Sequence, residues 1–192
     1  MTNDKSSDKE KFFAVNDANW GHKWGYQDSE FKLNKDRTVS MTGNRYDLCG
    51  FDMPDFIPYV EEMLDMTIEQ EDTLKEVEDK PVQDARINKA FLDAVKAEFP
   101  EDRFSMNAAE RLMHSQGQTT DEVYKVVFSK VDRATDMVFY IESEDEVQKL
   151  IDLALEHNVC LIPYGGGTSV SNALQIPELE NRMVVAVDPR RM

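Results

Sequence analysis

The most regular alternation of apolar and polar positions lies in the last third of the chain. Residues 137–141 and 159–164 are short, mostly apolar runs rich in branched side chains, and each predicts a buried strand. A further apolar run at 183–187 predicts a third strand. The segment between the first two runs opens with capping-box spacing at 143–146 and then repeats apolar residues on one helical face, at Val147, Leu150, Ile151 and Ala154. This order of elements predicts a parallel α/β arrangement, with Asn158 as a left-handed cap of the helix.

Helical periodicity also organises the middle of the chain. One face of a predicted helix carries Phe56, Tyr59, Val60, Met63 and Leu64. A second stripe, expected to lie in the core, comprises Ile87, Phe91, Ala94, Val95 and Phe99. Asn107 and Thr119 each begin a segment with capping-box spacing. They predict two short helices, the first closing at Gly117 and the second running to about Phe128.

These patterns divide the chain into three parts. Residues 1–19 form a tail that is expected to be disordered, since its first residues are polar and charged. Residues 20–130 form a mostly helical region, which opens with an aromatic cluster at 20–26 and a small hairpin at 31–41. Residues 131–192 carry the α/β pattern. Because a helical and hairpin segment precedes this α/β part, the predicted fold class of the whole chain is α+β. Three parallel strands leave little to cover both faces of their sheet, and we expect the chain to be the N-terminal portion of a longer protein or a shortened gene product.

Composition narrows the classes of function. The 192 residues include 41% hydrophobic residues, enough for a core, and carry a net charge of −16. That charge argues against nucleic-acid binding, which needs a basic face, and against attraction of the whole surface to an anionic membrane. No apolar run reaches transmembrane length, and the start lacks the apolar core of a signal peptide. Cys49 and Cys160 are expected to be reduced, and no metal site is expected because His22, His114 and His157 share no ligand spacing.

The candidate site is the glycine run that follows the second predicted strand. Its candidate cofactor-binding residues are Pro163, Tyr164, Gly165, Gly166, Gly167, Thr168 and Ser169. Three consecutive glycines let the backbone take φ > 0 and approach a ligand closely, and successive N–H groups in such a turn form a concavity suited to an anion. Two hydroxyl groups follow, and residues 170–174 are expected to begin a short helix whose N-terminus also favours negative charge. The pattern favours a phosphate or pyrophosphate cradle.

Other interpretations of the glycine run differ in how well they fit. A run of this kind after a strand is also typical of a simple tight turn, and these residues alone leave that alternative open. The nucleoside triphosphatase loop G-x-x-x-x-G-K-[ST] does not fit, because no lysine follows the glycines. The dinucleotide motif G-x-G-x-x-G fails because Val170 stands where its last glycine would be. A phosphate site at this position therefore belongs to another class.

Residues 163–171 resemble the pyrophosphate loop of flavoenzymes of the vanillyl-alcohol oxidase type, which carry a PCMH-type FAD-binding domain. Within these enzymes, the chain resembles the alkyldihydroxyacetonephosphate synthase (alkylglycerone-phosphate synthase) family. The further segments that match this family in order are 23–31, 42–46, 49–54, 133–141 and 184–192. The resemblance covers nearly the whole chain from about Trp20 and is weakest across 65–105.

This resemblance implies a fold and an activity. Residues 131–192 would begin a PCMH-type FAD-binding domain, incomplete here, with FAD held by residues 163–169. The whole protein would be a peroxisomal FAD-dependent transferase of ether-lipid and plasmalogen synthesis. It would exchange the acyl group of acyl-dihydroxyacetone phosphate for a fatty alcohol. The flavin would take electrons from the substrate carbon, hold the substrate covalently and return the electrons, while the protein supplies orientation and electrostatics.

The resemblance also sets limits. The family's catalytic tyrosine and histidines lie downstream, so we expect no catalytic residue in this chain and no synthase activity from residues 1–192 alone. No peroxisomal targeting signal is visible, and contact with the peroxisomal membrane and a homodimer stay open. The chain departs from the family pattern at 140–141 (Tyr-Ile for Trp-Pro), at 116–118 (Gln-Gly-Gln for His-Gly-His) and at Ala173, where glycine is common. These departures bear on the fine placement of the flavin, not on the family.

Two alternatives are kept beside the synthase. The first is an FAD-dependent oxidase or dehydrogenase of a 2-hydroxy acid, which shares the glycine loop but not the segments between residues 20 and 54. The second is a non-catalytic truncated fragment, which retains part of the cradle and binds flavin weakly or not at all.

Overall fold

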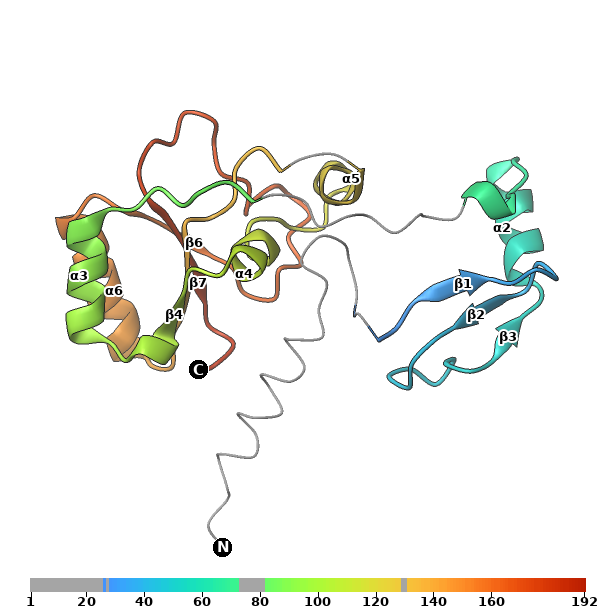
Figure 1. Cartoon of the computed structure of the whole chain (residues 1–192), viewed down its shortest axis with the longest axis horizontal. Coiled ribbons are helices and arrows are strands. Elements are labelled where there is room, and N and C mark those ends of the chain that lie inside the picture. Colours follow the sequence, from blue (N-terminus) through green and yellow to red (C-terminus); the bar gives the residue numbers. More distant parts are fainter. Residues whose placement is uncertain (1–25, 27, 73–81, 129–130) are drawn as a thin grey trace, which may run out of the picture. The chain divides into compact units, whose positions relative to one another are not determined.

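The computed structural model describes residues 26, 28–72, 82–128 and 131–192 (Figure 1). These residues form two compact units, one from the residues up to 72 and one from the residues from 82 onwards. The predictions of a disordered tail at 1–19 and, except for Tyr26, of an aromatic cluster at 20–26 lie outside the described residues.

The first unit is built on a three-stranded antiparallel sheet. Its strands run in the order β1 (Phe31–Leu33), β2 (Val39–Met41) and β3 (Asp52–Met53). β1 and β2 form the predicted hairpin, with Phe31 opposite Met41. The Asn34 amide closes its turn on the carbonyl of Thr38 at 2.9 Å. The alternation of side chains over 31–41 therefore predicted this element correctly.

Helix α2 (Phe56–Leu64) follows the sheet, and a 3-10 helix, η1 (Gln70–Asp72), follows α2. The predicted helix is confirmed, but its apolar stripe is not a buried face of this unit. Ile57 is buried, whereas the stripe residues Phe56, Tyr59, Met63 and Leu64 are exposed. The ring of Phe56 stacks on Phe31 with 6.2 Å between the ring centroids.

The second unit is built on a four-stranded sheet with the order β4-β5-β7-β6. β5 (Met137–Tyr140), β7 (Val184–Asp188) and β6 (Cys160–Pro163) are parallel, as predicted. β4 (Phe104–Ser105) adds an antiparallel edge that the hydrophobic pattern did not predict. β7 is the last of these strands in the sequence but lies between β5 and β6, so it is paired on both sides.

Four α-helices are described in this unit: α3 (Lys89–Glu98), α4 (Ala108–Met113), α5 (Thr120–Phe128) and α6 (Glu144–Glu156); a 3-10 helix, η2 (Glu101–Arg103), precedes β4. Ser143 caps α6 by accepting from the Glu146 amide at 3.3 Å, and Asn158 adopts φ 56° after it, as predicted. Asn107 caps α4 in the same way.

One predicted helix end is wrong. α4 ends at Met113 rather than closing at Gly117, because the chain turns at His114 and sends that side chain into the interior. Ser115 fixes the turn by donating its hydroxyl to the carbonyl of Arg111 at 2.5 Å and accepting from the Thr135 amide at 2.7 Å. Gly117 therefore lies outside the helix, in the connection between α4 and α5.

The core of the second unit lies between the sheet and a helix pair. α3 and α6 lie side by side along one face of the sheet (Figure 1). From the predicted stripes, the core receives Phe91, Val95, Phe99, Leu150 and Ala154, while Ile87 and Ile151 are exposed. The ring of Phe99 packs edge-on against the ring of Phe139 in β5, with 4.8 Å between the ring centroids. Because α3 packs on the sheet formed by β4, β5, β6 and β7, it belongs to the same compact unit as residues 131–192.

Other predictions concern cysteines and membrane spans. Cys49 and Cys160 are both free thiols, as predicted, and both are half-buried. Burial raises the pKa of the Cys160 thiol. Among the helices that the structure describes, none has the length and apolar character needed to cross a bilayer.

Asp136, just before β5, joins three segments of the second unit. Its carboxylate is fully buried. It accepts from the Arg86 amide and the Val184 amide, each at 2.8 Å, and from the Arg133 guanidinium at 3.1 Å. Through this carboxylate, Arg86, which precedes α3, is connected to Val184 at the start of β7.

We expect Asp136→Ala to lower the free energy of unfolding by about 3 kcal/mol, because it removes the acceptor of two backbone amides and the carboxylate partner of Arg133. Urea unfolding of the purified protein measures the change. Asp152→Ala, on the exposed side of α6, is the control and should stay within about 0.5 kcal/mol of wild type. Equal stability of the two variants would contradict the structural role of Asp136.

Candidate functional site

The predicted site lies where β6 ends. The seven candidate residues Pro163 to Ser169 leave the sheet at the carboxyl end of its parallel strands, the edge at which open α/β sheets place ligands. The amide of Tyr164 still donates to the carbonyl of Val187 in β7 at 2.8 Å. The glycine loop therefore starts from a backbone position that the central strand holds in place.

The three glycines of the loop have different surroundings. Gly165 has φ +60°, and a Cβ built on it would meet nothing within 4 Å. A Cβ on Gly166 would meet only the methyl group of Thr168, at 3.8 Å. Gly167 has φ +69°, and a Cβ there would collide with the phenol of Tyr164. The first two glycines thus border open space that a ligand can enter, while the third is required by packing within the protein.

The backbone amides of the loop fit an anion. The Gly167 amide donates to the Tyr164 carbonyl at 3.1 Å and closes a turn. For the amides of Gly165, Gly166, Thr168 and Ser169, no hydrogen-bond partner is present among the described residues. Amides that point out of a glycine turn are the donors expected of a diphosphate cradle. The residues present therefore fit the diphosphate of a dinucleotide.

The short helix predicted for residues 170–174 is absent. Ser169 accepts at its hydroxyl from the amides of Ser171 (3.4 Å) and Ala173 (3.2 Å). Asn172 adopts φ 58°, in the left-handed region. A left-handed residue in mid-segment cannot belong to a right-handed helix, so no helix N-terminus contributes to this site. The predicted preference for an anion rests on the loop amides alone.

The side chains of the predicted set do not all face the same way. Pro163 and Thr168 are exposed, and Gly167 is buried. The Tyr164 ring turns into the protein, where its hydroxyl donates to the Met113 carbonyl at 3.1 Å. Burial raises the pKa of this phenol. The structure thus brings the backbone of residues 163–169 to one loop and uses the Tyr164 side chain behind that loop.

Sequence reasoning missed a buried charged cluster behind the loop. The side chains of His114 and Asp188 are fully buried, with 3.0 Å between His114 Nε2 and Asp188 Oδ2. Arg190 pairs with the same carboxylate. The His114 ring lies 4.3 Å from the Tyr164 ring, centroid to centroid. The signal available in the sequence was Asp188 followed by Arg190 at the end of the last predicted strand.

Electrostatics favours the ionised form of Asp188. Burial alone would raise the pKa of this carboxyl, but the hydrogen bonds from His114 and Arg190 outweigh burial and hold the pKa well below its usual range. His114 Nδ1 faces the Glu110 carbonyl oxygen at 2.8 Å, so both ring nitrogens of this buried side chain have a polar neighbour. Within the described part of the chain, no group of three or more His, Cys, Asp or Glu side chains forms a metal site.

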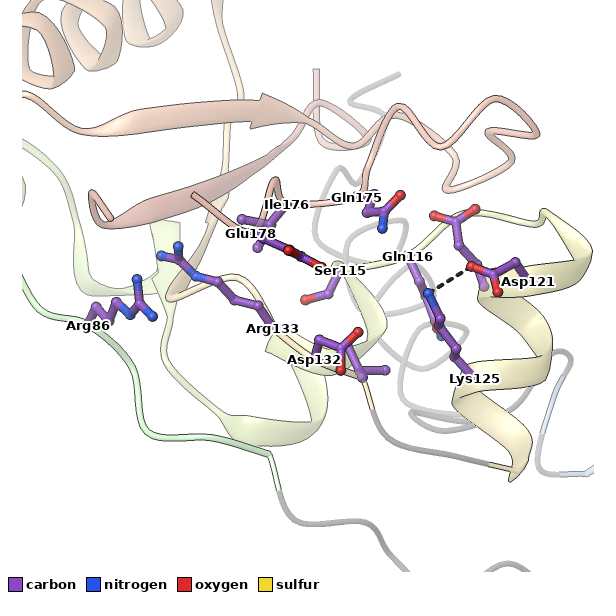
Figure 2. A pocket seen from close by; sticks show the side chains of 12 residues that line it. Arg86, Ser115, Gln116, Asp121, Lys125, Asp132, Arg133, Gln175, Ile176 and Glu178 are labelled. Carbon is purple, nitrogen blue, oxygen red and sulfur yellow. Dashed lines mark ion pairs between the residues drawn. The ribbon is translucent and has the colours of Figure 1, made fainter. Parts of the chain in front are cut away.

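A separate cavity of about 390 Å³ lies beside α5 (Figure 2). Its lining includes Ser115, Gln116, Gln175 and Ile176, but none of residues 163–169. Charged side chains of both signs surround it: Arg86, Lys125 and Arg133 with Asp121, Glu122, Asp132 and Glu178. Figure 2 shows the ion pair between Lys125 and Asp121, which are 2.8 Å apart. Such a mixed lining selects no particular ligand charge, and the cavity is distinct from the glycine loop.

The class of the site follows from the comparison with known families. Residues 135–192 match the family described as FAD binding domain. This match covers β5, α6, β6, the glycine loop and β7. It confirms FAD as the cofactor that the resemblance implied, and it agrees with a loop whose amides suit a diphosphate.

Longer matches identify the relatives. The chain is 38% identical over 169 residues to the alkyldihydroxyacetonephosphate synthase of Caenorhabditis elegans, a match that covers 86% of this chain and 27% of that protein. A solved structure of an alkyldihydroxyacetonephosphate synthase superposes with a TM-score of 0.75 and 26% identity, over 91% of this chain and 34% of the other. The resemblance is confirmed: the chain is related to alkyldihydroxyacetonephosphate synthases and corresponds to a part of their length.

A shorter match concerns a different enzyme. The mitochondrial D-lactate dehydrogenase (cytochrome) of Arabidopsis thaliana is 31% identical over 78 residues, which is 41% of this chain and 12% of that protein. In each of these comparisons, the chain spans less than half of the relative's length.

The low pKa of Asp188 predicts a pH dependence of stability. Because the folded state holds this pKa below the unfolded value of about 3.9, the carboxylate stabilises the fold above that value and loses its effect as the pH falls further. We expect Asp188→Asn to lower the free energy of unfolding by about 2 kcal/mol at pH 7, and the difference from wild type to narrow below about pH 4. Urea unfolding between pH 7 and pH 3 measures both effects.

Asp152→Asn, at an exposed position of α6, serves as the control for this experiment and should follow the wild-type profile throughout. A difference between Asp188→Asn and wild type that stayed constant down to pH 3 would show that charge at Asp188 is not the cause.

Proposed function

We propose that this chain supplies the pyrophosphate cradle and the preceding region of an FAD-dependent alkyldihydroxyacetonephosphate synthase. The enzyme would exchange the acyl group of acyl-dihydroxyacetone phosphate for a fatty alcohol in ether-lipid and plasmalogen synthesis. The observation that carries the proposal is the extent of the similarity, which reaches 86% of the chain and far exceeds the FAD-binding residues 135–192. The geometry of the glycine loop is consistent with it.

The chain's own residues would act on the cofactor by binding and orientation. The amides of Gly165, Gly166, Thr168 and Ser169 would donate to the diphosphate oxygens, and Thr168 itself is exposed. Amide donors matter in a chain of net charge −16, since the protein as a whole repels an anion. FAD, when bound, supplies the capacity to accept electrons from the substrate carbon and return them. We infer that acid–base groups and the lipid channel come from other parts of the protein.

A second candidate is an FAD-dependent dehydrogenase of a 2-hydroxy acid. It is favoured by the match to the D-lactate dehydrogenase, but that match covers 41% of the chain against 86% for the synthase. Incubation of the full-length protein with D-lactate and an artificial electron acceptor separates the two candidates. Reduction of the acceptor, without alkyl transfer, would favour the dehydrogenase.

The cradle is tested by Gly166→Asp in the full-length protein. Gly166 borders open space in the structure, so a carboxylate there should fold without a clash yet place negative charge against the diphosphate. We expect the purified variant to lose its bound flavin while it keeps wild-type far-UV circular dichroism. Gly166→Ala, which adds bulk without charge, is the matched control and should retain more flavin than the aspartate. A normal flavin absorbance band in Gly166→Asp would contradict the cradle.

Residues 1–192 on their own are expected to have no synthase activity, because a cradle provides neither acid–base groups nor a substrate pocket. An alkyl-transfer assay of the purified 192-residue chain, beside the full-length protein, measures this. Turnover comparable to that of the full-length protein would refute the expectation. We further propose, from the resemblance alone, a peroxisomal location, contact with the peroxisomal membrane and a homodimer; fractionation and light scattering of the full-length protein test them.

A further inference from the structure

One short segment of the chain contacts the glycine loop on its protein-facing side. Residues 113–118, called here the supporting segment, run from the end of α4 to the start of α5. They contact the glycine loop at two points, one before the glycines and one after them. The proposed flavin contacts lie between these two points.

The first contact point is the Tyr164 side chain. Its hydroxyl donates to the Met113 carbonyl at 3.1 Å, and its ring lies 4.3 Å from the ring of His114. The phenol also occupies the place that a Cβ of Gly167 would take. The last glycine of the run therefore rests directly on a tyrosine that the supporting segment holds.

The second contact point is the Ser169 carbonyl. It accepts from the amide of Gln118 at 2.6 Å. The same oxygen lies so close to Gly117 that a Cβ there would collide with it. Gly117 does not have a positive φ, so the close approach of two backbones, and not a left-handed conformation, requires glycine at this position.

Gly117 cannot easily move away from Ser169. Its amide donates to the buried Glu122 carboxylate at 3.0 Å. Glu122 in turn accepts from the Thr119 amide at 3.2 Å, and the Thr119 hydroxyl accepts from the Glu122 amide at 3.2 Å. This reciprocal pair is the capping box of α5, so the helix end fixes the position of Gly117.

We propose that the supporting segment positions the diphosphate-binding amides and that Gly117 is a positioning residue for flavin, although it lies outside the glycine run. A methyl group at Gly117 would push the Ser169 carbonyl away and rotate the neighbouring amides of the loop. Because binding sites tolerate displacements of only about 0.5 Å, this movement should weaken flavin binding without removing any flavin contact. The inference rests on the proposed function, since it requires flavin at the glycine loop.

The test compares three variants of the full-length protein: Gly117→Ala, Tyr164→Phe and Gly43→Ala. Gly43 is the matched control, because a Cβ there would collide with the Asp28 carbonyl in the first unit. The flavin dissociation constant of each variant is measured by fluorescence quenching, well below the melting temperature of its flavin-free form. Visible circular dichroism of the flavin-saturated protein reports how the bound flavin is oriented.

We expect Gly117→Ala to raise the flavin dissociation constant about tenfold or more and to change the visible circular dichroism of bound flavin. Tyr164→Phe, which loses one hydrogen bond and keeps the ring, should raise the constant by about threefold. Gly43→Ala should lower the melting temperature but leave both flavin measurements at wild-type values.

The outcomes separate this inference from the function on which it rests. If the wild-type protein bound no flavin, both would fall. If Gly117→Ala bound flavin with wild-type affinity and spectrum, or if Gly43→Ala weakened binding equally, the positioning role would be overturned and the flavin site would stand. Should Gly117→Ala fail to fold, Tyr164→Phe decides: weaker binding supports the inference, and unchanged affinity overturns it.

Discussion

The parallel pairing of β7 with its two neighbours is the constraint on which the second unit depends. β7 enters the sheet last in the sequence but lies between β5 and β6. Its pairing with β6 continues to Tyr164 and so determines where the glycine loop begins. At its two ends, the Val184 amide binds Asp136 and Asp188 binds His114 and Arg190. β7 thus pairs with both of its neighbours in the sheet and also contributes Asp188 to the buried cluster beside the glycine loop.

The glycine loop shows how one short motif can serve two purposes. Gly165 and Gly166 border open space, which lets a ligand reach the backbone, whereas Gly167 is needed because the Tyr164 phenol lies against it. The same tyrosine connects the loop to α4 and to the buried histidine. In the proposed cradle, backbone amides would let a chain with a net charge of −16 hold a diphosphate. No cluster of basic side chains is required.

Much of the second unit was predictable because its signals are local. The capping residues Asn107, Thr119 and Ser143 and the left-handed Asn158 act within a few positions of themselves, and the structure confirms each of them. The errors came where tertiary contacts override local preference. His114 enters the interior and ends α4 early, and Asn172 takes a left-handed conformation that prevents the helix expected after the loop. The stripe on α2 was correctly periodic, yet within its own unit it is exposed.

By itself, the sequence determined the class of the chain: the parallel α/β pattern, the glycine run after a strand and the motifs shared with flavin-dependent synthases. These features depend on residue type and spacing, and both can be read directly from the sequence. Only the tertiary structure decided the order of the strands, the burial of Asp188 with His114, and the contact between Gly117 and Ser169. Each of these joins residues that are 24 or more positions apart, the smallest separation being that of the β6–β7 pairs such as Cys160 and Val184. Contacts at such separations are not visible as a periodic pattern in the sequence, because only folding of the chain brings the partners together.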